Sequence, residues 1–263
     1  MTKNHDSKFH LNAQVKTQDL KLAKRIHFPS IDSTNMWAKQ QVGQWAADGI
    51  TLITAAEQTA GRGRFKRSWE SPPDVNIYAT FCFWMNAQRT DSGQIPQVLA
   101  LATAQTLEQL EFTPALKWPN DILLNRKKVG GILCETLLEQ EQRGIVCGIG
   151  LNVNMPADVL NRIDRPATSL FVEKQQLFDP AVVLELLQAR FVVDLNQFLK
   201  EGITPFFPRF QHYLAFKKEQ AIRFHDNQTQ VEAQFEEVRS DGSVVLRLKG
   251  GILKIFHAGE FIF

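Results

Sequence analysis

A glycine-rich segment between residues 61 and 69 carries a dense group of cationic side chains. Arg62, Arg64, Lys66 and Arg67 lie in it, and Gly61 and Gly63 alternate with the first two arginines. Arginine presents a planar fork that pairs with a carboxylate or a phosphate, and glycine lets the backbone fold closely around such a ligand. The segment therefore predicts a loop that is flexible when empty and closes around an anion. A solvated basic surface loop is the alternative that the segment alone leaves open.

Polar side chains follow a short predicted strand at residues 115–118. Pro119 ends this strand, and Asn120 and Asp121 come directly after the proline. Polar groups at a strand end, behind a rigid turn, are well placed for a binding or catalytic site. An Asn-Asp turn that only opens a hairpin is the alternative interpretation.

A basic turn and two glycine patterns follow further along the chain. Arg126, Lys127 and Lys128 lead into Gly130 and Gly131, and Gly148 and Gly150 alternate in a later strand. A lysine of the turn could reach a phosphate from the strand end. Alternate glycines leave one strand face bare, so that a flat ligand could lie against the backbone. A solvated hairpin tip and a strand that packs closely on a neighbour are the alternatives.

Several common catalytic motifs are absent from the sequence. It contains no G-x-x-x-x-G-K-[ST] loop, no G-x-G-x-x-G after a strand and no G-x-S-x-G elbow. The histidines are scattered, and Cys82, Cys134 and Cys147 form no C-x-x-C pair. We therefore predict neither a disulfide framework nor a metal site built from protein side chains.

The composition excludes further classes of function. Among 263 residues, 30 are Lys or Arg and 28 are Asp or Glu, and this near-balance argues against a nucleic-acid-binding surface. No apolar run approaches the ~18 residues of a membrane span, and residues 1–25 lack the apolar centre of a secretory signal. The sequence predicts a cytoplasmic protein that binds neither nucleic acid nor membranes.

The predicted elements place these segments in a mixed sheet flanked by helices, an α+β fold. A helix begins after Asp32–Asn35 and carries Ala38, Val42 and Trp45 on one face, a second spans 98–110, and a third runs from Asp179 to Gly202. Strands are expected at 50–56, 77–85, 115–118, 122–124, 132–134 and 145–153. After Tyr213, short strands at 221–224, 231–238, 243–248, 252–256 and 261–263 indicate a small β-barrel. The expected organisation is an N-terminal arm at 1–25, a catalytic domain at 26–215 and a barrel at 216–263.

Taken in order, these motifs resemble those of biotin–protein ligases. They are Ser33-Thr34-Asn35, Gly61-Arg62-Gly63-Arg64, Arg67-x-Trp69, Lys117-Trp118-Pro119-Asn120-Asp121, Lys128-x-x-Gly131 and Gly148-x-Gly150-x-Asn152. The resemblance spans roughly residues 33–152 and implies a catalytic domain like that of class II synthetases with a C-terminal SH3-like barrel. The implied type lacks the amino-terminal DNA-binding domain of the repressor members.

The resemblance implies a two-step reaction with biotin, ATP and Mg²⁺. Biotin and ATP first give biotinyl-5′-AMP and pyrophosphate, and a lysine of a biotin carboxyl-carrier domain then displaces AMP. The expected partner is the carrier domain of acetyl-CoA carboxylase, and a homodimer is possible in this family. Attack on an anionic α-phosphate needs cations that neutralise the growing charge.

The family pattern assigns roles to individual residues of this chain. Arg62 and Arg64 would close over the ligand, Lys128 would bind biotin and phosphate oxygens, and Asp121 would orient the acceptor lysine. Ser33, Thr34, Asn35 and Gln58 would hold biotin, Trp69 would lie near the adenine, and Asn120 would contact phosphate or metal. The remaining expected binding residues are Gly61, Gly63, Arg67, Lys117, Gly131, Gly150 and Asn152. Phe65-Lys66 and Asp74 depart from the family pattern, which has glycines in those segments, and the departures should stiffen the loop.

Three other interpretations stay open at this point. A lipoate–protein ligase or octanoyltransferase of the same superfamily would share the fold. A sensor that binds biotinyl-adenylate without catalysis would share the pocket, and a carrier-docking module would share the surface.

Overall fold

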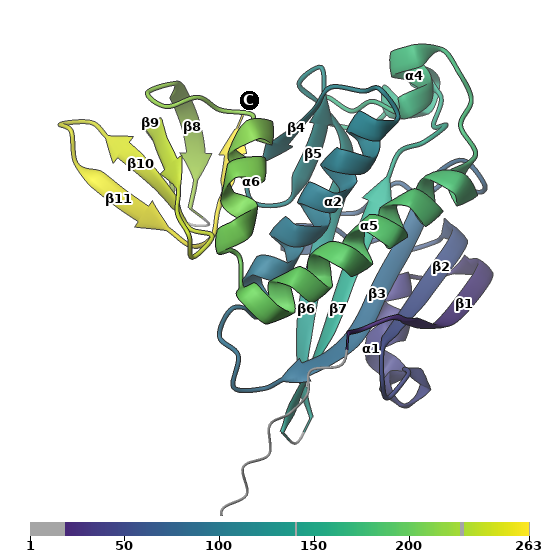
Figure 1. Ribbon diagram of the computed structural model, residues 1–263. Helices are drawn as coiled ribbons and strands as arrows, with labels where there is room; N and C mark the ends of the chain where they lie inside the picture. Colours follow the sequence, from purple (N-terminus) through teal and green to yellow (C-terminus); the bar gives the residue numbers. More distant parts are fainter. Residues whose placement is uncertain (1–18, 140, 227–228, 263) are drawn as a thin grey trace, which may run out of the picture.

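A seven-stranded mixed sheet forms the main body of the protein, and a smaller antiparallel sheet follows it (Figure 1). The computed structural model describes residues 19–139, 141–226 and 229–262. The strands of the main sheet lie in the order β1-β2-β3-β7-β6-β5-β4, with β1 parallel to β2 and every other neighbouring pair antiparallel. Their bounds are Leu22–Ile31 (β1), Ile50–Gln58 (β2), Ile77–Asn86 (β3), Pro114–Lys117 (β4), Asp121–Leu124 (β5), Lys127–Glu139 (β6) and Gln142–Leu151 (β7).

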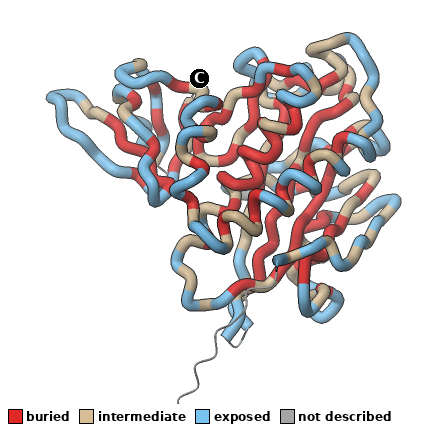
Figure 2. Tube along the Cα trace, viewed as in Figure 1, coloured by how far each residue is buried: buried red, intermediate tan, exposed pale blue. Residues whose placement is uncertain are grey.

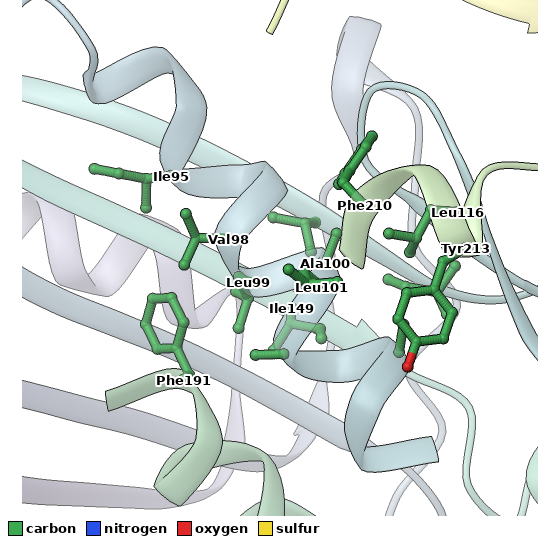
Figure 3. Packing of buried hydrophobic residues seen from close by; sticks show 14 of the residues in the cluster. Ile95, Val98, Leu99, Ala100, Leu101, Leu116, Ile149, Phe191, Phe210 and Tyr213 are labelled. Atoms are coloured by element: carbon green, nitrogen blue, oxygen red, sulfur yellow. The ribbon is translucent and has the colours of Figure 1, made fainter. Parts of the chain in front are cut away.

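Helices α2 (Ile95–Gln109) and α5 (Pro180–Glu201) cover one face of this sheet (Figures 1 and 3). Helix α2 is apolar on nearly all sides and packs against both the sheet and α5, and its leucines pack with Phe191 and Ile149. Asp179 caps the N-terminus of α5 and Gly202 ends it. The predicted second and third helices are thus confirmed, and Figure 2 shows them over a buried sheet interior.

The opposite face of the sheet carries α1 (Thr34–Gln40). Successive strand residues alternate between the faces, so that Leu52 belongs to the core on the side of α2 and α5 whereas Ile53 packs with Ala38 of α1. Ser33 caps α1 by accepting a hydrogen bond from the amide of Met36. The predicted helix begins where expected but ends at Gln40. Its apolar spacing continues into a short 3-10 turn instead, from Val42 to Gln44.

The sequence pattern missed strand β1. Its side chains alternate between half-buried and exposed, because β1 lies at the edge of the sheet. Its apolar alternation is therefore weaker than that of the central strands. The expected border between arm and catalytic domain at residue 25 falls inside this strand. Residues 1–18 of the expected arm lie outside the described residues.

The second sheet contains the short strands predicted after Tyr213. Its order is β11-β10-β9-β8-β12, and neighbouring strands are antiparallel. Gly242, Gly250 and Gly251 have positive φ angles and form the turns that the sequence indicated. The strand bounds are Ala221–His225 (β8), Gln230–Val238 (β9), Val244–Leu248 (β10), Leu253–Phe256 (β11) and Glu260–Ile262 (β12).

Short helices complete the described part of the chain. No helix in that part is long and apolar enough to cross a membrane. The α-helices are Ala157–Leu160 (α3), Leu170–Lys174 (α4) and Phe207–Tyr213 (α6), and further 3-10 turns span Arg64–Lys66, Ser92–Gln94 and Thr204–Phe206.

Trp118 joins the two sheets. Its side chain is buried, its indole N–H donates to the carbonyl of Gly242 at 2.8 Å, and its ring contacts Phe224 and Phe261 of the barrel. The same carbonyl accepts a second hydrogen bond from Gln97 of α2. The barrel is therefore fixed at the end of β4, next to Asn120 and Asp121.

Replacing Trp118 with alanine is expected to lower the free energy of unfolding by about 3–5 kcal/mol, because a large buried ring is lost from the joint. Trp118→Phe keeps a ring but leaves the Gly242 carbonyl with one donor fewer, and should lower it by about 1–2 kcal/mol. Urea unfolding at a single temperature measures both values. Equal losses for the two variants would mean that the ring itself contributes nothing to the joint.

Candidate active site

One cavity of about 380 Å³ opens beside the ends of β5 and β6. All of the site residues expected from the sequence line it except Gly61 and Lys117. Gly61 lies directly beneath the loop, where a Cβ atom would collide with the backbone of Trp69. Lys117 lies behind Asp121, with 3.8 Å between its ammonium nitrogen and the nearer carboxylate oxygen.

The N-terminal turn of α1 supplies a cluster of polar groups at one end of the cavity. The amide of Thr34 donates to Gln58 Oε1 at 3.0 Å, and Gln58 Nε2 donates to the hydroxyl of Ser71 at 3.1 Å. Gln58 thus keeps one amide hydrogen for a ligand. Asn35 lies over Gly148, where a Cβ atom would collide with the Asn35 amide.

The Trp69 indole covers the glycine strand face. A Cβ atom at Gly150 would collide with the Trp69 ring, and one at Gly131 would lie 3.2 Å from that ring. The idea that a ligand lies directly on bare Gly150 is therefore wrong for this structure, because Trp69 occupies that position. Gly131 and Gly150 allow the Trp69 ring to approach the backbone closely. The Trp69 side chain in turn lines the cavity.

An ion-pair group lies at the turn after β4. Lys128 Nζ is 2.6 Å from Asp121 Oδ1, and Lys117 lies on the other carboxylate oxygen. Burial lowers the pKa of Lys117, and the charge of Asp121 partly offsets that effect. Lys128 also lies 5.4 Å from the Trp69 ring centre, and a Cβ atom at Gly131 would lie 3.0 Å from its ammonium nitrogen. Lys128 is thus confined between a carboxylate, an indole and a glycine.

The segment at residues 61–69, called the arginine loop below, lines the cavity and contacts the barrel. Arg64 donates to Asn120 Oδ1 at 3.1 Å and to the carbonyl of Gly259 at 3.4 Å. Burial lowers the pKa of Arg64, and the carboxylates of Asp121 and Glu260 oppose this effect. Arginine stays charged at neutral pH nonetheless, because the guanidinium group is a very strong base.

Glu260 of the barrel holds two arginines near the cavity mouth. Its carboxylate lies 2.6 Å from Arg67 of the loop and 3.6 Å from Arg165. Together with the Arg64 contact to Gly259, these ion pairs connect the loop to β12. These contacts attach the loop to the barrel.

The departures of the loop from the family pattern have a backbone consequence. Phe65 and Asp74 both have positive φ angles, 57° and 63°. Residues with side chains rarely adopt this conformation, and glycine adopts it readily. At Asp74 the backbone thus has the conformation that explains the glycine expected there.

The comparisons with known proteins agree with this geometry. The sequence profile of the biotin/lipoate A/B protein ligase family matches residues 27–152. The biotin–[acetyl-CoA-carboxylase] ligase of Paracoccus denitrificans is 33% identical over 181 residues, which are 66% of this chain and 74% of that protein. This chain belongs to the biotin/lipoate A/B protein ligase family.

Two further relatives are similar to this chain in sequence or in structure. The bifunctional ligase/repressor of Bacillus subtilis (strain 168) is 32% identical over 201 residues, or 75% of this chain, and the match spans 60% of that relative's length. The biotin protein ligase of Aquifex aeolicus, solved in complex with biotin and ATP, superposes with a TM-score of 0.76 at 27% identity. That match covers 92% of this chain and 98% of the other, and it confirms the predicted α+β fold with its small second sheet.

The family motifs did not reveal every residue of the cavity. A segment after β7 and the tip of the barrel also line it. The sequence gives little signal for them, because they lie far along the chain from the motifs and their charges resemble those of a surface loop. These residues include Arg162, Ile163, Asp164, Arg165, Ala167 and Glu260.

Proposed function

We propose that the protein is an ATP-dependent ligase that forms biotinyl-5′-AMP and transfers biotin to a lysine of a carrier domain. The observation that carries the proposal is a single cavity lined by Arg62, Arg64 and Lys128 and by the polar turn of α1. Relatives support the choice of substrates, because the Aquifex aeolicus ligase is bound to biotin and ATP. The name of the Paracoccus denitrificans relative supports acetyl-CoA carboxylase as the source of the carrier domain.

The first step joins the biotin carboxylate to the α-phosphorus of ATP, and pyrophosphate leaves. Negative charge grows on the phosphate oxygens, and the cations that line the cavity neutralise it. Ser33 and Gln58 are the polar groups that bind biotin at the α1 end. Lys128 and the arginine loop bind the acyl-phosphate at the other end. The two ends are two residues apart along the strands, because Asn35 lies at Gly148 whereas Trp69 lies at Gly150.

Mg²⁺ enters with ATP in this proposal. No group of three or more His, Cys, Asp or Glu side chains that could hold a metal occurs in the described ranges. Mg²⁺ commonly keeps several waters and binds substrate phosphates with one or two protein oxygens. The cavity offers the buried Asn152 Oδ1, which has no hydrogen-bond partner among the described residues. This oxygen fits such an ion, which would supply charge neutralisation at the phosphates.

The second step needs a neutral acceptor lysine. Asp121 is the carboxylate that can hold this lysine and take its proton. Lys128 occupies Asp121 Oδ1 at 2.6 Å. We infer that Lys128 turns toward the adenylate when it forms, so that the acceptor lysine can replace it at Asp121.

The adenylate is a reactive anhydride, so its retention matters. Replacing Glu260 with glutamine removes the partner of Arg67 and should raise the rate of adenylate release about 3–10-fold, because the loop then opens more often. Release of radiolabelled biotinyl-AMP from preloaded protein measures this rate. Glu237→Gln, an exposed carboxylate of the same barrel, is the matched control, and equal release rates for the two variants would refute the role of Glu260.

Labelling of a purified carrier domain tests the proposed function. The protein, biotin, ATP, Mg²⁺ and the carboxylase carrier domain are combined, and biotin is detected by avidin blot and mass spectrometry. We expect one biotin on one lysine, and none without ATP. No labelling beside a working control ligase would reject the proposal.

Pyrophosphate exchange separates the remaining interpretations. A biotin ligase exchanges labelled pyrophosphate into ATP when biotin is present and not when lipoate or octanoate replaces it. Exchange that depends on lipoate or octanoate would identify an acyl ligase of the other type. Binding of biotin without exchange would identify a sensor. A homodimer and a cytoplasmic location stay predictions.

A further inference from the structure

Asn35 donates both of its side-chain amide hydrogens to groups of the protein. Its Nδ2 donates to the carbonyl of Leu133 at 3.0 Å and to Glu135 Oε2 at 3.3 Å. Lys39, one turn further along α1, holds the other oxygen of Glu135 at 2.6 Å. An asparagine amide has two hydrogens, so Asn35 has none left to donate to biotin.

A threonine of the central strand holds the opposite side of this amide. Thr80 of β3 is fully buried, and its hydroxyl lies 2.7 Å from Asn35 Oδ1 and 2.8 Å from Thr34 Oγ1. A hydroxyl can donate one hydrogen bond and accept another, so Thr80 can donate to Asn35 Oδ1 and accept from Thr34. The Thr34 hydroxyl also lies 3.1 Å from Gln58 Oε1, so its single hydrogen is shared between Thr80 and Gln58. Thr80 is thus the point at which the first turn of α1 is attached to the sheet.

We propose that Thr80 is a positioning residue for biotin binding, acting through Thr34 and Asn35 without contacting the substrate. This inference rests on the proposed function. Thr80 fixes the direction of the Thr34 hydroxyl and orients the Asn35 amide above Gly148. The backbone amide and the hydroxyl of Thr34 in turn lie 3.0 and 3.1 Å from Gln58 Oε1 and orient that side chain, which lines the cavity. Thr80 therefore sets the arrangement of donors and acceptors that biotin meets.

The burial of this contact explains why one hydroxyl matters. Without Thr80, Asn35 Oδ1 loses its donor at a position that is almost closed to water, and a buried carbonyl without a donor is unfavourable. The amide then rotates or draws in water, and Thr34 follows because it shares the same hydroxyl. Neither change reaches the cations at the phosphate end.

The test compares two substitutions at position 80. Thr80→Val keeps the shape and removes the hydroxyl, whereas Thr80→Ser keeps the hydroxyl and removes a methyl group. We expect Thr80→Val to raise the KM for biotin about 10-fold or more, with the KM for ATP and kcat changed less than about threefold. Thr80→Ser should restore the KM for biotin to within about threefold of the wild type.

Thr103→Val is the matched control. Thr103 is also fully buried, and its hydroxyl donates to the carbonyl of Leu99 within α2, away from the cavity. It undergoes the same chemical change, and we expect an unchanged KM for biotin. Thermal unfolding of all variants reports their folded fraction.

The outcomes distinguish this inference from the proposed function. A folded Thr80→Val protein with the wild-type KM for biotin overturns the positioning role alone. The same holds if Thr80→Ser raises the KM as much as Thr80→Val, or if Thr103→Val does so. A wild-type protein that neither binds biotin nor exchanges pyrophosphate overturns the proposed function, and the positioning role with it.

Discussion

Replacing Lys128 with glutamine is expected to slow biotinyl-adenylate formation by about 100-fold or more. Removal of one preorganised group that stabilises developing charge has effects of this size in other enzymes. Lys128 is held between Asp121, Trp69 and Gly131, so its ammonium group has a defined position in the cavity. Biotin-dependent pyrophosphate exchange measures the step directly.

Lys127→Gln is the matched control for this prediction. Lys127 is the adjacent residue of the same hairpin, but its side chain is exposed and does not line the cavity. We expect exchange within about twofold of the wild type for this variant. Lys128→Arg should also be slow, because Gly131 and Trp69 leave little room for a guanidinium group. If Lys128→Gln retains exchange within threefold of the wild type, Lys128 does not act on the reacting phosphate.

Replacing Asp121 with asparagine should affect the second step most. Without a carboxylate to take its proton, the acceptor lysine is mostly an ammonium ion at pH 7, and transfer should slow by about 100-fold or more. Adenylate formation should slow less than about tenfold, because Lys128 and the arginine loop, which act on the phosphate, are still present. Single-turnover transfer from preformed adenylate, followed by mass spectrometry of the carrier, separates the two steps. Equal slowing of both steps would contradict a specific role in transfer.

The transfer defect of Asp121→Asn should shrink at high pH. An ordinary lysine has a pKa of about 10.4, so the neutral fraction of the acceptor rises steadily between pH 7 and 9.5 without help from a base. The ratio of wild-type to variant rates should fall over that range. A ratio that stays constant would mean that Asp121 orients the lysine and does not deprotonate it.

The loss in the free energy of unfolding caused by Asp121→Asn should also shrink at high pH. Burial lowers the pKa of Lys117 and the charge of Asp121 opposes this effect, so the attraction of Asp121 stabilises the fold while Lys117 is charged. That contribution is present below the pKa of Lys117 and is lost as the pH rises through it. The stability deficit of Asp121→Asn should therefore be largest near neutral pH and smaller in alkali.

The motif residues lie along one cavity because each motif lies at the end of a strongly patterned element. The apolar runs of β3 and α2 predicted the sheet and the helix that covers it. The turns that carry the motifs were then expected to lie at one edge of that sheet. Strand β1 escaped prediction for the converse reason, since an edge strand buries too little to show a clear alternation.

The other features that the sequence did not predict depend on contacts between distant parts of the chain. Nothing near Glu260 in the sequence indicates that it would meet Arg67, because the contact exists only once the barrel has docked on Trp118. Likewise, the glycine at position 150 predicted a close approach, but not that Trp69 would make it. Thr80 lay hidden within an apolar strand, where its hydroxyl gave no signal.

A crystal structure with bound biotinyl-5′-AMP, or a stable analogue of it, tests the central claim most directly. The account predicts that Lys128 Nζ and the guanidinium groups of Arg62 and Arg64 all lie within about 3 Å of oxygens of the same acyl-phosphate. If those three side chains point into separate regions of solvent around the bound adenylate, the cavity does not assemble the reaction described here.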